Sequence, residues 1–170
     1  MDLSQKEWWG LIHGMGFGAV FLLAFAGGIA GLYSLRPELV TDAGIRERMI
    51  RLKIGVVAMA VAAWGTVITG TWIVYPWYRA KSVDSPKSIL LSSESTKNWH
   101  DFGMEWKEHI AWISPILATV AAFIVIYFGT GLIKHDRARK IVMTLFVLAF
   151  VMAAIAGIFG ALITKVAPVK

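Results

Sequence analysis

Histidine is the residue type in this sequence best suited to bind a metal. Cysteine is absent from the 170 residues, which removes thiolate ligands, iron–sulfur clusters and the C-x-x-C-H attachment of haem. A bound metal would therefore need imidazole, carboxylate, methionine sulfur or backbone oxygen as ligands. Of the four histidines, His13 and His109 each stand near the point where a polar stretch gives way to a long hydrophobic run. These two residues are the leading candidates for a ligand pair.

Long apolar segments dominate the chain that must position them. Hydrophobic residues make up 57% of it and charged residues only 16%, with a mean hydropathy of +0.64, a composition outside the range of soluble globular domains. Four segments are nearly free of charge, residues 11–33, 54–75, 110–133 and 141–164. Each is long enough to cross roughly 30 Å of hydrocarbon as a helix, whereas strands of a β-barrel would alternate apolar and polar residues. The sequence therefore predicts an all-α integral membrane protein, a bundle of four transmembrane helices.

We expect one transmembrane domain over residues 1–170. Its predicted helices are residues 11–33, 54–75, 98–133 and 141–164, with a loop at 76–97. The third helix is expected to project beyond the membrane before it descends. A kink is predicted at Pro115, because proline has no backbone N–H to donate to the helix.

Basic residues are unevenly divided between the two ends of this bundle. The connections 34–53 and 134–140 together hold nine basic and four acidic residues, whereas the rest of the chain holds eight basic and seven acidic ones. By the positive-inside rule these connections face the cytoplasm, so the N and C termini and the 76–97 loop face outwards. We expect the membrane to be a bacterial inner (cytoplasmic) membrane. Inner-leaflet phospholipid accounts for the net charge of +6 without a nucleic-acid partner.

His13 and His109 are predicted to lie at similar depth, because the helices that carry them run in the same direction. Two imidazoles at one depth can hold a metal or a haem iron between two helices of a bundle. At helical spacing His13 shares a face with Gly16 and Phe17, where missing side chains leave room for a flat macrocycle. His109 shares a face with Trp112, which offers an apolar wall. The predicted metal ligands are therefore His13 and His109.

Three charged residues near the same end complete the candidate site. Glu105 could orient the His109 ring through its second nitrogen, and Glu105 or Glu108 is the best-placed proton acceptor if a quinol is oxidised here. The two carboxylates could otherwise stay solvated or pair with Lys107 or a loop lysine. Arg79 could contact a haem propionate or a quinone headgroup, although anchoring at headgroup depth is the simpler reading.

The glycines have a simpler explanation too. Spacings of the form G-x-x-x-G occur at Gly10, Gly14 and Gly18 and again at Gly27 and Gly31. Such spacings let helices pack closely without a cofactor. Histidines at a membrane surface can likewise do no more than bond to water, headgroups or a neighbouring helix.

Two further histidines are weighed as alternatives. His100 is a spare ligand that could replace His109 as the partner of His13 if the third helix sits deeper, and is otherwise a surface residue at headgroup depth. His135 is expected to be solvated on the cytoplasmic side. The hydroxyls of Thr66 and Thr69 are expected to bond to their own helix rather than line a channel.

With four spans and the His13–His109 pair, the chain resembles the small four-helix b-type membrane cytochromes, such as cytochrome b561-like proteins and haem-anchor subunits. This is a resemblance of architecture, and those proteins commonly carry more histidines. It implies one haem b near the outer surface, possible contact with quinone, and electron transfer between the quinone pool and an outer-side partner such as a c-type cytochrome. The setting it implies is a larger respiratory or photosynthetic complex in the lipid bilayer.

A cofactor-free subunit that anchors or stabilises a membrane complex is the alternative function. A transporter or channel is disfavoured, because the predicted spans lack Asp, Glu, Lys and Arg, which usually mark ion pathways.

Overall fold

The fold is a bundle of long helices. The computed structural model describes residues 2–168, and within that range there are helices but no strand. Four of these helices are long and apolar enough to cross a membrane, namely Gln5–Ser34, Asp42–Tyr78, Glu94–Lys134 and Asp136–Val166. The predictions of an all-α protein and of four membrane-spanning helices are confirmed.

Each of the first three long helices is a chain of shorter segments. The first consists of α1 (Gln5–Leu11), the π-helical turn η1 (Ile12–Gly16) and α2 (Phe17–Ser34). The second consists of α3 (Asp42–Thr69), the π-helical turn η3 (Gly70–Val74) and α4 (Tyr75–Tyr78). The third consists of α6 (Glu94–Asn98), the π-helical η4 (Trp99–Met104), α7 (Glu105–Ile110), α8 (Ile113–Phe128) and the 3-10 helix η5 (Gly129–Lys134). The fourth is α9 (Asp136–Val166), and the connections hold η2 (Pro37–Leu39) and α5 (Pro86–Leu91).

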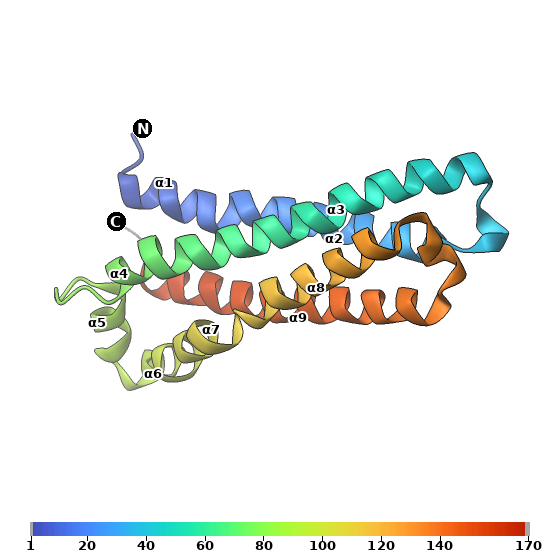
Figure 1. The fold of residues 1–170 in the computed structure, drawn as a ribbon. Coiled ribbons are helices and arrows are strands. Elements are labelled where there is room, and N and C mark those ends of the chain that lie inside the picture. The colour runs from blue at the N-terminus through green and yellow to red at the C-terminus, as the bar shows by residue number, and fades with distance from the viewer. Residues whose placement is uncertain (1, 169–170) are drawn as a thin grey trace.

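The helices form a ring in which sequence neighbours pack side by side. In Figure 1, α2 lies along α3, α3 along α8 and α8 along α9, and α9 returns to contact α2. The first and third long helices therefore face each other across the bundle. The connections 34–42 and 129–136 lie at one end, the hairpin end, and α1, α4 to α7 and the last turns of α9 lie at the other, the terminal end (Figure 1). The two basic connections thus share an end, as the charge pattern predicts, while the side of the membrane that each end faces stays a prediction.

The second and third helices begin earlier than their hydrophobic segments. The second begins at Asp42 rather than at residue 54, because the Thr41 hydroxyl accepts the Gly44 N–H at 3.2 Å and caps a first stretch rich in charge. The third begins at Glu94, and the predicted loop 76–97 contains α5. Hydropathy identifies the apolar part of a helix and misses the turns that are made of polar and charged residues.

The third long helix is interrupted just before Pro115 in the sequence. Residues 111–112 form a turn between α7 and α8, where the Ala111 carbonyl accepts from Ser114 N at 3.2 Å. Pro115 has no N–H for that carbonyl, which accounts for the tighter bond. The kink angle predicted here stays a prediction. At its other end α8 stops at Gly129, whose φ of +50° only glycine adopts readily.

Aromatic rings and a glycine join the first helix to the fourth. Phe25 stacks on Phe150 with ring centroids 4.1 Å apart, and Phe146 lies 5.8 Å from Phe25 and is fully buried. A Cβ at Gly28 would lie 2.4 Å from Phe146 Cε1. Gly28 is therefore the position where α2 admits the ring of α9.

Most of the G-x-x-x-G glycines do not lie against another helix of this chain. A Cβ added at Gly10, Gly14, Gly18 or Gly27 would meet no heavy atom within 4 Å, and only Gly31 approaches a neighbour, Leu52, at 3.4 Å. The spacing marks positions where a second helix could approach but cannot tell whether one lies there.

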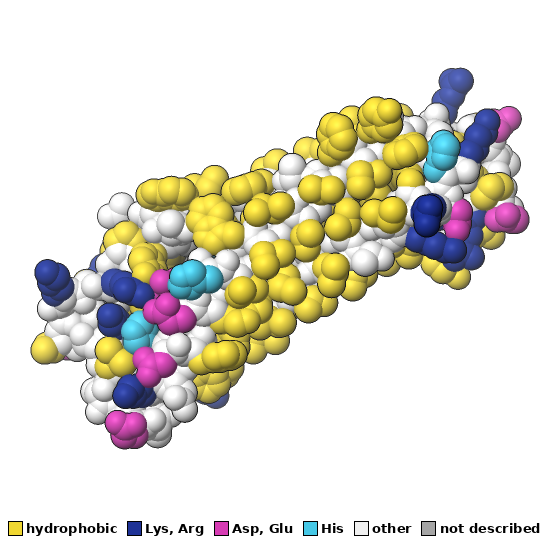
Figure 2. Space-filling view, turned by 60° about the horizontal axis from the view of Figure 1, so that its bottom comes forward, with side chains coloured by type: hydrophobic (Ala, Val, Ile, Leu, Met, Phe, Trp, Pro, Cys, Tyr) yellow, Lys and Arg dark blue, Asp and Glu magenta, His cyan; other side chains and the backbone are white. Residues whose placement is uncertain are grey.

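The surface has the polarity of a membrane protein. Figure 2 shows hydrophobic side chains over the middle of the molecule and charged side chains gathered at the two ends. Many large apolar residues are exposed along the helices, among them Leu23 at 75% and Phe123 at 67%. Exposed apolar surface of this extent suits contact with lipid.

Candidate functional site

The His13 ring is fixed against the second long helix. Its Nδ1 lies 3.1 Å from the Thr69 hydroxyl, and a Cβ added at Gly70 would lie 2.9 Å from its Cε1. His13 belongs to the π-helical turn η1, and Gly70 begins the π-helical turn η3. The absence of a side chain at Gly70 is what lets the half-buried imidazole lie on that helix.

The hydrogen bonds of Thr69 determine which His13 nitrogen carries the proton. The Thr69 hydroxyl donates to the Gly65 carbonyl at 2.7 Å, in the bond to its own helix that the sequence predicts. A hydroxyl has one proton to give, so it accepts from His13 Nδ1–H. Nε2 is then unprotonated and keeps a lone pair, the form in which imidazole binds a metal.

His100 is buried, contrary to the expectation of a surface residue. It is 7% exposed, and its Nδ1 lies 2.8 Å from the Tyr78 hydroxyl. Its neighbours in the packed cluster at the terminal end are Leu90, Met104 and Ile163. The Thr96 hydroxyl donates to the carbonyl of Leu90, a member of this cluster, at 2.7 Å. The 76–97 segment thus folds over His100 instead of leaving it at the surface.

His109 lies on the outside of the bundle. Its side chain is 71% exposed, and its Nδ1 donates to the backbone carbonyl of Glu105 at 2.8 Å. The Glu105 carboxylate is 4.0 Å away. The Glu105 backbone oxygen therefore holds this ring, and the predicted role of the carboxylate toward a ligating His109 stays a prediction.

Lys107 faces the bundle interior. Its Nζ lies 2.9 Å from the position that a Cβ on Gly160 of α9 would take. His109 follows Lys107 by two residues, or about 200° around a helix, so the two side chains leave α7 in nearly opposite directions. A shared iron between His13 and His109 would require α7 to turn about its axis. That ligand pair stays a prediction.

Arg79 joins the second helix to the third through two carboxylates. Its Nη2 lies 3.1 Å from Glu105 and 3.2 Å from Glu108, and the Tyr75 hydroxyl donates to Glu108 at 2.8 Å. Burial acts to lower the pKa of Arg79, but the charges of Glu108, Tyr75 and Glu105 outweigh it and raise that pKa above its ordinary value. Of the alternatives left open for the two carboxylates, the structure shows pairing with a basic residue, and that residue is Arg79 rather than Lys107 or a loop lysine.

The remaining predicted site residues are Phe17, Gly16 and Trp112. Phe17, on the first long helix, is half-buried against the second long helix, where a Cβ at Gly65 would come within 2.6 Å of its ring. Gly16 is exposed. The Trp112 ring meets Trp64 and Trp72 edge to face at 6.2 and 6.3 Å. Phe17 and Trp112 are thus packing residues here, and their roles toward a cofactor stay predictions.

Sequence patterns miss the residues that fix these histidines. Thr69, Gly70 and Tyr78 lie far along the chain from the rings that they contact, so only the fold brings them together. The sequence marks only Lys107, as a lysine that stands just before a predicted transmembrane segment in a helix that is expected to continue into it. In residues 2–168 no group of three or more His, Asp or Glu side chains is arranged to hold a metal ion.

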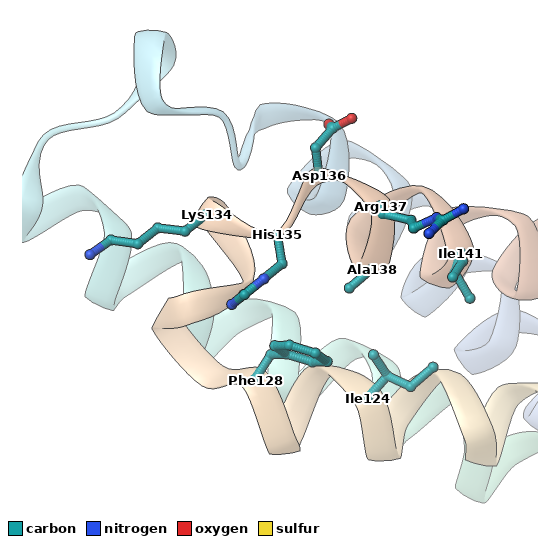
Figure 3. Close-up of a pocket in the computed structure, with 8 residues that line it drawn as sticks. All are labelled: Ile124, Phe128, Lys134, His135, Asp136, Arg137, Ala138 and Ile141. Atoms are coloured by element: carbon teal, nitrogen blue, oxygen red, sulfur yellow. The ribbon is translucent and has the colours of Figure 1, made fainter.

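A separate hollow lies at the hairpin end. It has a volume of about 530 Å³ and is open to one side, and its lining residues are Ile124, Phe128, Lys134, His135, Asp136, Arg137, Ala138 and Ile141. Figure 3 shows the exposed His135 pointing toward Phe128, with Lys134 and Arg137 at its edges. Apolar walls with basic residues at the rim suit a phospholipid, and this hollow is remote from the terminal-end histidines.

Comparison with known proteins leaves the site as the main source of inference. No family model, no curated protein and no solved structure matches this chain. The fold and composition define a membrane protein with four candidate spans. What it does must be inferred from the side chains at the terminal end.

Proposed function

We propose that this chain is a b-type cytochrome subunit that transfers electrons between the quinone pool and an outer-side partner. The observation that carries the proposal is that the His13 ring is held by Thr69 through Nδ1, which leaves Nε2 as the nitrogen free to bind a metal. A histidine whose other nitrogen is bonded to a fixed acceptor is the usual form of a metal ligand. Bound haem would supply one-electron chemistry, and this chain would supply its position and surroundings.

The second axial ligand is His109 or, as the spare, His100. Both rings have Nδ1 bonded, to the Glu105 carbonyl and to the Tyr78 hydroxyl respectively. In His109 this leaves Nε2 as the lone-pair nitrogen, because a carbonyl can only accept. The burial of His100 favours it as a ligand in a site that excludes water. The membrane depth predicted for His109, similar to that of His13, favours His109. Single substitutions separate the two.

The cluster of Arg79, Glu105, Glu108 and Tyr75 is suited to receive protons from a quinol. Glu108 accepts from the Tyr75 hydroxyl at 2.8 Å and is only 18% exposed. A carboxylate at the membrane surface with a tyrosine beside it provides an acceptor for the quinol's proton and a path for that proton toward the outer side. Arg79 pairs with this carboxylate at 3.2 Å and so holds it beside Tyr75.

The orientation of the bundle agrees with these roles. The basic connections mark the hairpin end as cytoplasmic by the positive-inside rule, which puts the histidines on the outer side, most simply of a bacterial inner membrane. A partner such as a c-type cytochrome would approach the terminal end. Other membrane subunits would cover the exposed apolar flanks.

A cofactor-free anchoring subunit is the second candidate. It is favoured by Gly10, Gly14 and Gly18, where a Cβ would lie more than 4 Å from any other helix in residues 2–168. Small residues on an uncovered helix face allow a second transmembrane helix to approach closely. The two candidate functions differ in whether the chain binds haem.

A dithionite-reduced minus oxidised absorbance spectrum of the purified chain tests the proposal. We expect a b-type α-band that His13→Ala abolishes and that His135→Ala, at the exposed hairpin end, leaves unchanged. Loss of the band in either His100→Ala or His109→Ala identifies the second ligand. A flat wild-type spectrum in haem-replete cells refutes the cytochrome and leaves the anchoring subunit.

A further inference from the structure

The hollow at the hairpin end lies where α8 gives way to α9. Its volume of about 530 Å³ falls within the roughly 300–1,000 Å³ of ligand sites in proteins. Ile124 and Phe128 of α8 form one apolar wall, and Ala138 and Ile141 of α9 form the other (Figure 3). Ile141 is 48% exposed, and α9 continues beyond it as an apolar helix long enough to span a membrane. An apolar chain that enters this hollow can therefore continue along the exposed flank of α9.

Two cations stand at the rim of this hollow. Figure 3 shows the Lys134 and Arg137 side chains at opposite edges, and both are exposed. Over residues 2–168 neither forms an ion pair with a carboxylate of this chain. The exposed His135 lies between them in the sequence, with its ring centroid 4.9 Å from that of Phe128. The rim thus offers two available positive charges and an imidazole beside an apolar wall.

Asp136 also borders the hollow, but its charge is already matched by basic residues of its own helix. It pairs with Arg139 and, at 2.7 Å, with Lys140 Nζ. In Figure 3 its carboxylate points away from Phe128. The rim therefore keeps its positive charge toward an anion.

We propose that this hollow is a binding site for one anionic phospholipid, whose phosphate lies at the rim beside Lys134 and Arg137 and whose acyl chain lies on the apolar walls. A ligand that uses the whole hollow must carry a negative charge and a long apolar chain. Phospholipid has both, and basic residues immediately beside a transmembrane segment lie at the depth of the lipid headgroups. A soluble anion would leave the walls bare, whereas a neutral lipid would leave the two cations unmatched.

This inference does not depend on haem. The histidines of the proposed haem site lie at the terminal end of the bundle, whereas the hollow lies at the hairpin end (Figure 1). The two proposals can therefore be tested separately.

The test is a lipid titration of the full-length chain in detergent, followed by native mass spectrometry, which resolves the chain with and without one bound lipid. Two probes with identical acyl chains are compared, anionic phosphatidylglycerol and zwitterionic phosphatidylcholine. Arg137→Gln has Arg46→Gln as its matched control, since both arginines are exposed near the hairpin end and form no ion pair within residues 2–168. Arg137→Lys keeps the charge and serves as the conservative variant.

A second pair of variants tests the apolar wall without a change of charge. Ile141→Trp places a larger side chain in the hollow, whereas Val147→Trp places one on the same helix at a position that does not line it. The two residues are 48% and 42% exposed, so both positions have room for the ring.

We expect the wild type to bind phosphatidylglycerol at least about tenfold more tightly than phosphatidylcholine, because two basic residues act on the headgroup. Arg137→Gln should weaken phosphatidylglycerol binding about fivefold and leave phosphatidylcholine binding unchanged, the scale of one basic residue at an anionic surface. Arg46→Gln and Arg137→Lys should keep most of the preference. Ile141→Trp should lose most of the phosphatidylglycerol binding, and Val147→Trp should retain it.

Three results overturn the inference. If Arg46→Gln weakens phosphatidylglycerol binding as much as Arg137→Gln does, the lipid responds to the charge of the whole end and not to this site. If Ile141→Trp binds like Val147→Trp, the acyl chain lies outside the hollow. If the wild type binds the two lipids equally, the rim does not select an anion. None of these results bears on the haem spectrum, so the cytochrome proposal is judged on its own.

Discussion

Replacing Gly28 by alanine should destabilise the bundle, although alanine is the better helix former. The added Cβ would lie 2.4 and 2.7 Å from two ring carbons of Phe146, which is fully buried and backed by Phe25. The ring cannot move away without taking a strained rotamer or separating α2 from α9. Overpacking of this kind costs about 1–3 kcal/mol.

Gly27→Ala is the matched control for this prediction. Its Cβ meets nothing within 4 Å, so it reports the helix-propensity gain of alanine, at most about 1 kcal/mol, without a clash. The difference between the two variants removes the propensity contribution. We expect the Gly28 variant to be less stable than the Gly27 variant by about 1–3 kcal/mol.

Unfolding by SDS in mixed micelles, followed by far-ultraviolet circular dichroism, measures both free energies of unfolding. The double variant Gly28→Ala/Phe146→Leu should recover part of the loss, because leucine vacates the ring position, and a double-mutant cycle gives the coupling. Equal stability of the Gly27 and Gly28 variants, or no coupling to Phe146, would show that α2 and α9 do not pack at this glycine.

Three other substitutions test the site and the end of α8. Thr69→Val removes the acceptor of His13 Nδ1–H and should weaken haem binding about tenfold or more in a Soret titration. Arg79→Gln should lower the free energy of unfolding by only about 1 kcal/mol or less, since Arg79 and Glu108 are 36% and 18% exposed and their pairing is screened. Gly129→Ala should cost about 1–3 kcal/mol in the same SDS titration, because its φ of +50° and ψ of −135° strain any residue with a Cβ.

Each of these has a neighbouring control. Thr66→Val removes a hydroxyl bonded only to its own helix and should leave haem affinity unchanged. Lys81→Gln, at an exposed lysine near Arg79, and Gly131→Ala, whose Cβ meets nothing, should leave stability unchanged. A test variant that behaves like its control contradicts the contact assigned to that residue.

The helices were predictable from sequence because lipid-facing and core-facing residues are both apolar. Hydropathy therefore finds the spans without knowing which face is which. It missed the first turns of the second helix, which starts at Asp42, since residues 42–53 are rich in charge and stand outside the apolar segment. It also could not tell that Gly28 packs while Gly27 does not, because that depends on the rotation of α2 against α9.

The site was less predictable than the fold, for a related reason. Placing His109 toward His13 assumed a regular helix from residue 98 onwards, yet residues 99–104 are π-helical. Every side chain beyond that turn, including Lys107, is rotated from its regular position. Contacts such as His13 with Thr69 join residues 56 positions apart, which no local pattern encodes.

The π-helical turns make this end of the molecule tolerant of a change in chain length. Such a turn holds one more residue than the α-helical turn that it replaces. Deleting one residue from Gly70–Val74 would therefore restore a regular helix and leave Tyr75 and Arg79 pointing nearly as before. The same deletion in the regular helix α3 would instead turn everything after it by about 100° around the axis, and Arg79 would lose Glu108 as its partner.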